Sequence, residues 1–249
     1  MLPNGEDRPH LIASQRGSRP VPSRPGPLWP ATGFLGQLSE ETRQAALKLG
    51  TFRRYRPGDV VLHEGAISDC AVLLLSGLYK VVGSLGSGRE ALVAIRIGGD
   101  IVGELGLADG DPRSATVKAV GRGEGRRVGE RDCHDFLARF PDANRAMNRA
   151  MADKLRSATR RRVEFATCSA PTRMARVLLE LKAAHGIPMR EGFAIDVALT
   201  QPELAALVGV TEPTIHRVLT TLRRDGVLDT GYRSILILDE RRLEGLAQP

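Results

Sequence analysis

The segment from Ile101 to Val117 holds residues whose types and spacing could bind an anion. Gly103 has no side chain to block a close approach, and Arg113 offers a planar fork of N–H donors that matches phosphate oxygens. Ser114 adds a hydroxyl and a backbone N–H. Glu104 is negatively charged and would repel a phosphate, so we assign it as a hydrogen-bond acceptor for another part of the ligand. These residues predict a small anion pocket.

Two short elements would bring these residues together. Residues 104–107 can form one helical turn whose free backbone N–H groups face an anion. The Asp-Gly-Asp-Pro run at 109–112 is typical of a turn, which would fold the second half of the segment over the first. From the spacing alone, an ordinary surface loop with an ion pair is an equally good interpretation.

This run resembles the phosphate-binding cassette of cyclic-nucleotide-binding domains. The resemblance implies that the glycine and the Arg-Ser pair hold the cyclic phosphate, and that the glutamate holds the ribose 2′-hydroxyl. The ligand-binding residues expected within the cassette are Gly103, Glu104, Leu105, Arg113, Ser114 and Ala115.

Composition limits the classes of protein to which the chain can belong. Its 249 residues, of which 42% are hydrophobic and 26% charged, suffice for two modest globular domains. No apolar run is long enough to span a bilayer and no secretory signal is evident, so we expect a cytoplasmic protein without a membrane partner. The three cysteines and five histidines are scattered without metal-ligand spacing, which predicts no metal site and no cofactor.

The charge distribution qualifies the argument for a nucleic-acid partner. The net charge is +7, which favours a polyanionic partner, but residues 167–249 contain ten basic and ten acidic side chains. The excess lies instead in residues 142–166, which contain seven basic and three acidic side chains. Net charge therefore cannot identify a DNA-binding segment here.

The N-terminal half divides into a tail and a β-rich domain. Residues 1–33 contain seven of the fifteen prolines and no apolar period, so we predict a disordered tail, although its arginines could touch a phosphate backbone. Residues 34–141 begin with a short helix over 34–50, N-capped by Ser39, and continue as short apolar runs between glycine-bearing turns. The expected strands of this β-roll, or jelly roll, are 60–62, 71–75, 78–82, 92–97 and 115–120.

Two helices follow the β-roll. After a short helix over 131–140, residues 142–167 contain no glycine or proline and should form one long helix. Its residues Met147, Met151, Leu155, Ala158, Arg162 and Phe165 form a stripe close to a heptad seam. The stripe could pack on the β-roll of its own chain, on a partner helix, or on both. The arginines at 156 and 160–162 are most simply a solvated face.

Residues 168–249 are predicted to form a winged helix-turn-helix domain. Residues 168–172 break the long helix, and an amphipathic helix follows over 172–185. Thr200 and Glu203 form a capping box, Gly209 permits a tight turn, and Thr211 caps a second helix whose inward residues are Ile215, Val218, Leu219 and Leu222. Strands at 227–228 and 235–238 would form a wing. The alternative is a helical hairpin inside a bundle. The predicted wing argues against it, because a wing is typical of the DNA-binding unit.

The second helix of such a unit lies in the DNA major groove, so its outer residues reach DNA. Arg217 is the strongest candidate for a base contact, because its fork matches guanine O6 and N7. Arg233, near the wing tip with Tyr232, suits a phosphate contact. The expected DNA-binding residues are Thr200, Thr211, Glu212, Thr214, His216, Arg217 and Arg233, with Thr220 and Arg224 as further candidates.

From 142 to 239 the arrangement is similar to the Crp/Fnr family of bacterial transcription regulators. The resemblance implies an α+β chain with an N-terminal cyclic-nucleotide-binding β-roll (34–141), a long dimerisation helix (142–167) and a C-terminal winged helix-turn-helix (168–249). It also implies a homodimer that joins through residues 142–167, binds double-stranded DNA and a cyclic nucleotide, and contacts RNA polymerase. No nucleophile–base–acid set is present, so we predict no enzyme and no catalytic residues.

Two departures from the family pattern concern specificity. An Arg-Glu pair that opens the recognition helix in well-known members is replaced here by Glu212-Pro213, so the operator should differ. The Thr-Ser pair that faces adenine in cyclic AMP sensors is Ala158-Thr159 here, which leaves Thr159 to hydrogen-bond the base. Cyclic AMP is the first choice of effector, cyclic GMP or another nucleotide stays open, and a vestigial pocket is the alternative. The N-terminal segment has no cysteine cluster, which excludes an iron–sulfur sensor.

Overall fold

The computed structural model describes residues 29–67, 69–85, 89–195, 197, 199–231 and 234–248. Residues 1–28 of the predicted tail lie outside the described residues, and so do Tyr232 and Arg233 of the predicted wing. Residues 29–33, which the sequence assigned to the tail, are described. Trp29 is buried there, and its indole N–H donates to the Leu75 carbonyl at 2.8 Å.

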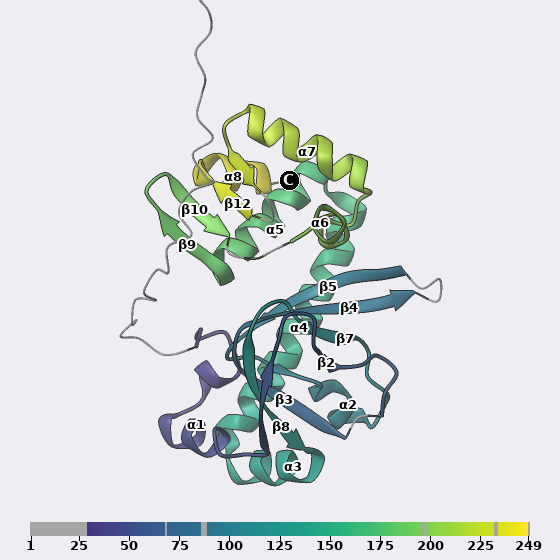
Figure 1. Ribbon diagram of the computed structural model, residues 1–249, viewed down its shortest axis with the longest axis vertical. Helices are drawn as coiled ribbons and strands as arrows, with labels where there is room; N and C mark the ends of the chain where they lie inside the picture. The colour runs from purple at the N-terminus through teal and green to yellow at the C-terminus, as the bar shows by residue number, and fades with distance from the viewer. Residues whose placement is uncertain are drawn as a thin grey trace, which may run out of the picture.

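The N-terminal half is a roll of two four-stranded antiparallel sheets (Figure 1). One sheet has the order β1-β8-β3-β6 and the other the order β2-β7-β4-β5. Buried side chains of both sheets, among them Val72, Tyr79 and Val117, form one cluster between them. The strands are β1 (Thr51–Tyr55), β2 (Val60–Leu62), β3 (Cys70–Ser76), β4 (Leu78–Leu85), β5 (Arg89–Ile97), β6 (Ile101–Val102), β7 (Thr116–Ala119) and β8 (Gly123–Gly129).

Helices cover the outer face of the β1-β8-β3-β6 sheet. In β3, Val72 and Leu74 face the inside of the roll, whereas Ala71 and Leu73 join a second cluster with helical residues such as Phe136. This alternation buries both faces of the strand. The elements on this side are η1 (Leu35–Gln37), α1 (Glu40–Ala46), α3 (Glu130–Arg139) and the start of α4 (Pro141–Thr167). The helix expected over 34–50 is therefore a 3₁₀ turn followed by α1, and Ser39 caps α1 as predicted.

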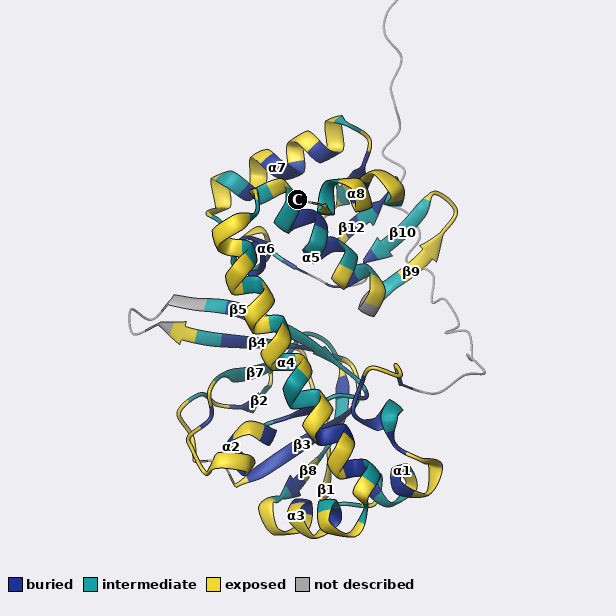
Figure 2. Ribbon diagram, turned by 180° about the vertical axis from the view of Figure 1, so that it is seen from behind, coloured by how far each residue is buried: buried dark blue, intermediate teal, exposed yellow. Residues whose placement is uncertain are grey.

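The apolar stripe of α4 divides among three environments. Met147 is buried, and Met151 packs partly buried against the same cluster of the β-roll. Leu155 is 69% exposed, and Arg162 is exposed as well. Figure 2 shows much of the middle of α4 in the colour of exposed residues. Phe165 lies against the C-terminal domain. The first part of the stripe thus packs on the β-roll of its own chain, and the middle part is a free helix face.

The C-terminal half combines helices with a four-stranded sheet of order β11-β12-β10-β9. The predicted wing is present as β11 and β12, but β11 includes residues 229–231, which were expected to form the turn. The β9–β10 hairpin was not predicted. The elements are α5 (Ala170–His185), β9 (Gly186–Met189), β10 (Gly192–Ile195), α6 (Gln201–Val208), α7 (Glu212–Arg224), β11 (Leu228–Gly231), β12 (Ser234–Ile237) and α8 (Glu240–Ala247). Only Cys168 and Ser169 separate α4 from α5, so the break is shorter than the predicted 168–172.

The two halves are in direct contact through the β4–β5 hairpin and α6 (Figure 1). Val82 and Leu92 of the hairpin belong to the apolar cluster of the C-terminal domain. Beside them, Lys80 Nζ lies 2.6 Å from Glu203 Oε1. Burial opposes ionisation of Glu203, but hydrogen bonds from Lys80 and Thr200 outweigh it and hold the pKa of Glu203 below its usual value.

One carboxylate fastens α1 to α4 and should make stability depend on pH. Asp142 accepts from the Ser39 N–H at 3.0 Å and from the Thr42 hydroxyl at 2.8 Å. Burial opposes its ionisation, but these bonds hold the pKa of Asp142 below its usual value. The ionised form therefore stabilises the folded state above the unfolded pKa of about 3.9, and this contribution is lost as the pH falls through the folded pKa.

We expect Asp142→Ala to lower the free energy of unfolding at pH 7 by about 1 kcal/mol, the usual net contribution of a hydrogen bond. The difference from the wild type should shrink in acid, because the wild-type carboxyl is then protonated. Urea unfolding at pH 7 and near pH 3 measures both values. Asp135→Ala, which removes a carboxylate that is 75% exposed on α3, is the control. A loss that is as large in acid as at neutral pH would contradict the prediction.

Candidate functional site

The cassette, residues 103–115, folds around one buried guanidinium. Gly103 has φ +83° and precedes the short helix α2 (Glu104–Asp109), as the sequence predicts. Arg113 is 5% exposed and donates to the Gly103 carbonyl at 2.6 Å and to the Cys70 carbonyl. A Cβ on Gly103 would lie 2.6 Å from Arg113 Nη1. Glycine is thus required both by the backbone angle and by the space that Arg113 occupies.

An acidic residue also lies beside Arg113. Asp69 Oδ1 is 3.6 Å from Arg113 Nη2, and Arg127 of β8 binds the same carboxylate at 2.8 Å. A hydrogen bond from the Cys70 thiol, together with the charge of Arg127, lowers the pKa of Asp69. Asp69 therefore stays ionised at neutral pH and competes with any anion for Arg113. Sequence reasoning missed Asp69.

Glu104 is joined to the long helix by an ion pair that the sequence did not predict. The Glu104 carboxylate is 4% exposed and lies 2.7 Å from Lys154 Nζ of α4. Lys154 also donates to the Ile101 carbonyl at 3.0 Å. Burial lowers the pKa of Lys154, and the charge of Glu104 opposes that shift. Lys154 lies 50 residues from Glu104 in the sequence, so no local motif indicates it.

The other predicted ligand residues lie in more open positions. Ser114 is exposed, Ala115 is half-buried, and Leu105 is 43% exposed. Thr159 is exposed on α4, and no hydrogen bond joins it to the cassette within the described residues. The structure thus brings Gly103, Glu104 and Arg113 together and leaves Thr159 apart from them.

Helices α6 and α7 form the predicted helix-turn-helix unit. The capping box is present, because Thr200 accepts from the Glu203 N–H and Glu203 accepts from the Thr200 N–H. Gly209 ends α6 with φ +69°. Thr211 lies at the N-cap of α7 but makes no capping bond to the backbone; its hydroxyl lies 3.0 Å from the Thr214 hydroxyl. The predicted cap is wrong in this respect, since the two hydroxyls pair with each other.

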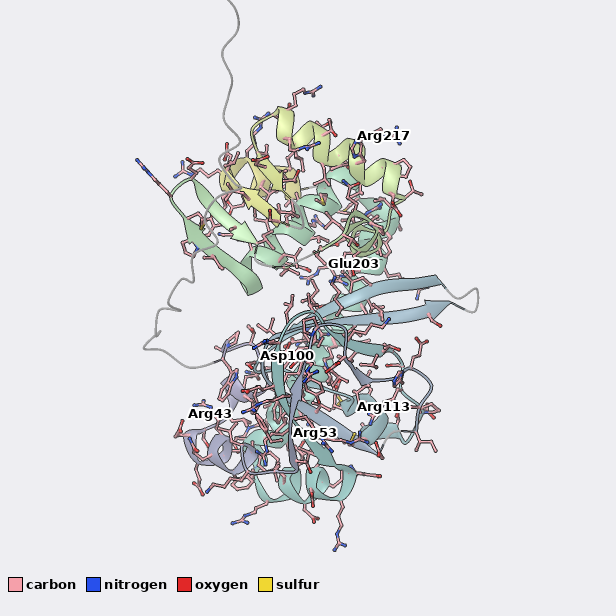
Figure 3. All side chains as sticks on the ribbon, in the orientation of Figure 1. Arg43, Arg53, Asp100, Arg113, Glu203 and Arg217 are labelled. Atoms are coloured by element: carbon pink, nitrogen blue, oxygen red, sulfur yellow. The ribbon has the colours of Figure 1, made fainter. Side chains whose placement is uncertain are left out.

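One face of α7 is free and carries the predicted DNA-contacting residues. Ile215, Val218, Leu219 and Leu222 are buried, as predicted. Glu212, His216 and Arg217 are exposed, whereas Thr214 is half-buried. Figure 3 shows Arg217 at the opposite end of the molecule from the β-roll and Arg113. Thr200 lies at the start of α6 beside Lys80, within the contact between the two halves.

Two family models match the chain one after the other. Residues 52–140 match the model described as a cyclic nucleotide-binding domain, and residues 172–246 match the Crp-like helix-turn-helix domain. The chain belongs to the Crp/Fnr family. It is therefore a DNA-binding transcription regulator with a cyclic-nucleotide-binding domain, and the similar proteins are regulators rather than enzymes, in agreement with the prediction.

Individual Crp/Fnr relatives match over most of their length. A CRP-like cAMP-activated global transcriptional regulator of Mycobacterium tuberculosis is 29% identical over 188 residues, which is 75% of this chain and 83% of the relative. A cyclic AMP receptor protein of Thermus thermophilus is 28% identical and covers 86% of this chain and 95% of its own length. A crystal structure of a CRP-family regulator from Thermus thermophilus has 25% identity and a TM-score of 0.67, covering 79% of this chain and 97% of that one.

Within the described residues, no three histidine, cysteine or acidic side chains are grouped closely enough to hold a metal ion. None of the described helices has the length and apolar character that a bilayer crossing requires.

Proposed function

We propose that this Crp/Fnr regulator is a homodimer whose binding to double-stranded DNA is controlled by a cyclic nucleotide, with cyclic AMP as the first choice. The observation that carries the proposal is the buried Arg113 packed on Gly103 beside Glu104. Its bonds to the two carbonyls and to Cys70 Sγ, the last at 3.5 Å, use three of the five N–H donors of a guanidinium. A cyclic phosphate could accept from the others while Glu104 accepts from the ribose.

The ion pair between Glu104 and Lys154 gives the ligand a route to α4. A ribose hydroxyl that donates to Glu104 would share the carboxylate with Lys154 and so act on the long helix. The relatives named as cAMP-activated support cyclic AMP. Ala158, in place of a polar residue, removes one hydrogen bond to adenine and keeps cyclic GMP as the second nucleotide to test.

The exposed middle of α4 supports a homodimer. Leu155 is 69% exposed and Val163 is 55% exposed on the surface of a 27-residue helix. A second copy of the same helix would bury these apolar residues around a twofold axis. Two recognition helices would then lie about 34 Å apart on one face of the duplex.

A second candidate is a Crp/Fnr regulator that responds to no cyclic nucleotide. It is favoured by the contacts of Arg113 with Gly103, Cys70 and Asp69, which compete with a phosphate for the guanidinium. If those contacts hold the DNA-binding form, the pocket is vestigial and DNA binding is constitutive.

Binding to DNA with and without nucleotide separates the two candidates. A duplex is first selected from a randomised pool, and its affinity for the full chain is measured by fluorescence anisotropy with no nucleotide, with cyclic AMP and with cyclic GMP. Tighter binding with cyclic AMP is expected, because coupling free energies of about 1–3 kcal/mol are typical. Equal affinity in all three conditions would support the vestigial pocket, and a monomer in sedimentation would overturn the dimer.

In the same assay we expect Arg217→Ala to reduce discrimination at one base position by about 1–3 kcal/mol, because the exposed fork of Arg217 can pair with guanine. Affinities for duplexes with single base changes measure this effect. Arg131→Ala, which removes an equal charge from α3 at a side chain that is 94% exposed, should change nothing. A uniform loss across all sequences would make Arg217 a phosphate contact.

A further inference from the structure

The junction between α4 and α5 contains an arginine that bonds the ends of two other helical segments. Arg173, in the first turn of α5, donates to the Phe165 carbonyl at 3.2 Å and to the Cys168 carbonyl at 3.0 Å, at the end of α4. The same guanidinium donates to the Val208 carbonyl at 2.9 Å and to the Gly209 carbonyl at 3.2 Å, at the end of α6. The last carbonyls of a helix lack partners within the helix, so Arg173 satisfies two helix ends at once.

An aromatic ring completes this contact. The guanidinium carbon of Arg173 lies 5.5 Å from the centre of the Phe165 ring. A Cβ on Gly209 would lie 2.5 Å from that ring, and Gly209 has φ +69°. Phe165, near the end of the long helix, therefore packs directly on the turn between α6 and α7. Glycine is needed at position 209 for two reasons: the turn requires a positive φ, and a side chain would clash with the Phe165 ring.

Neighbouring ion pairs hold α4 to α5 without reaching this turn. Arg176 pairs with Glu164 at 2.9 Å and also donates to the Ala247 carbonyl of α8. Arg160 pairs with Glu180 at 2.9 Å. Arg173 differs from Arg176 and Arg160 because its bonds extend to the carbonyl of Gly209, from which the path to the recognition helix α7 is only two residues long.

We propose that Arg173, stacked on Phe165, is a positioning residue that fixes the recognition helix relative to the long helix and transmits ligand binding to DNA binding. A planar fork that bonds four carbonyls tolerates little change in the angle between α4 and the turn. A movement of the end of α4 must therefore carry the turn with it or break these bonds. The transmission role depends on the proposed function, whereas the positioning role does not.

The test compares Arg173→Lys with Arg176→Lys. Both variants keep the charge and lose the fork on the same helix, but the bonds of Arg176 do not involve the helix-turn-helix turn. Affinity for the selected duplex is measured with and without cyclic AMP, and cyclic AMP affinity is measured by calorimetry. For Arg173→Lys we expect the ratio of the two DNA affinities to fall by about tenfold, within the usual range of coupling, with unchanged cyclic AMP affinity. Arg176→Lys should keep the wild-type ratio.

Phe165→Leu removes the ring and keeps the arginine, and should also lower the ratio. It provides the test if Arg173→Lys does not fold, as judged by circular dichroism. An unchanged ratio in the folded variants, or an equal fall in Arg176→Lys, would overturn the proposal. If wild-type DNA binding ignores nucleotides, the proposed function fails instead. In that case the positioning role of Arg173 is tested by DNA affinity without nucleotide, which must be lower for Arg173→Lys than for Arg176→Lys.

Discussion

Replacing Arg113 with leucine is expected to weaken cyclic nucleotide binding by about 2–5 kcal/mol, the usual cost of removing one partner of a buried charge pair. Leucine can fill part of the same space but cannot donate to a phosphate. Calorimetric titration of wild type and variant with cyclic AMP and with cyclic GMP measures the loss. The two nucleotides share the phosphate, so both should be affected equally.

A structural contribution of Arg113 must be separated from this effect. Arg113→Leu also leaves the Gly103 and Cys70 carbonyls without their donor, and an unpaired buried polar group costs about 1–3 kcal/mol. Urea unfolding of the variant measures that loss independently. Arg131→Leu is the control, because it removes an equal charge from a side chain that is 94% exposed on α3. Equal heats from wild type and a folded Arg113→Leu would remove the ligand proposal.

The sequence predicted best the parts of the site that depend on neighbouring residues. The cassette is one continuous loop, so Gly103 and the following helical turn could be recognised from residue types alone. The capping box at Thr200 and the positive φ of Gly209 are also local, and both are present. The buried face of α7 follows from helical spacing and agrees residue by residue.

Partners distant in the sequence could not be predicted. Lys80 and Glu203 are 123 residues apart, and Arg173 and Val208 are 35 apart. Each side chain alone is typical of an exposed charge, and only the packing of the domains brings the partners together. The predicted solvated patch on α4 shows the same limit, because Arg160 and Arg161 both pair with Glu180 of α5.

Strand β8 was missed for a different reason. Its sequence, Gly-Glu-Gly-Arg-Arg-Val-Gly, has no apolar alternation. Glycine is needed there because a Cβ on Gly123 would lie 2.3 Å from the Tyr79 hydroxyl, and one on Gly125 would lie 3.0 Å from the Leu73 carbonyl. Close packing thus removed the signal by which strands are recognised.

Replacing Lys154 with methionine is expected to lower the free energy of unfolding by about 3 kcal/mol, the lower end for breaking a buried ion pair. Methionine has a similar length, but it leaves the Glu104 carboxylate, which is 4% exposed, without its cation. The lower end applies because the Lys154 side chain is itself 23% exposed. Urea unfolding at pH 7 measures the loss. A midpoint equal to that of the wild type would show that the pair contributes nothing to stability.

Glu104→Gln should cost less than Lys154→Met, because the two residues left behind respond differently. A stranded lysine can lose its proton, and burial already lowers the pKa of Lys154. Lys154→Met instead leaves a buried negative charge without its cation. The double variant Glu104→Gln/Lys154→Met has no charge to strand and should recover most of the stability lost in Lys154→Met, which a double-mutant cycle measures.

The pH dependence of Glu104→Gln provides an independent check on this pair. Without the carboxylate, the pKa of Lys154 in the folded state should fall further below the unfolded value of about 10.4. Between those two pKa values the unfolded chain binds more protons, so stability should rise with pH in that window. The double variant lacks the lysine and should not show this rise. An equal rise in both variants would assign the pH dependence to other groups and not to Lys154.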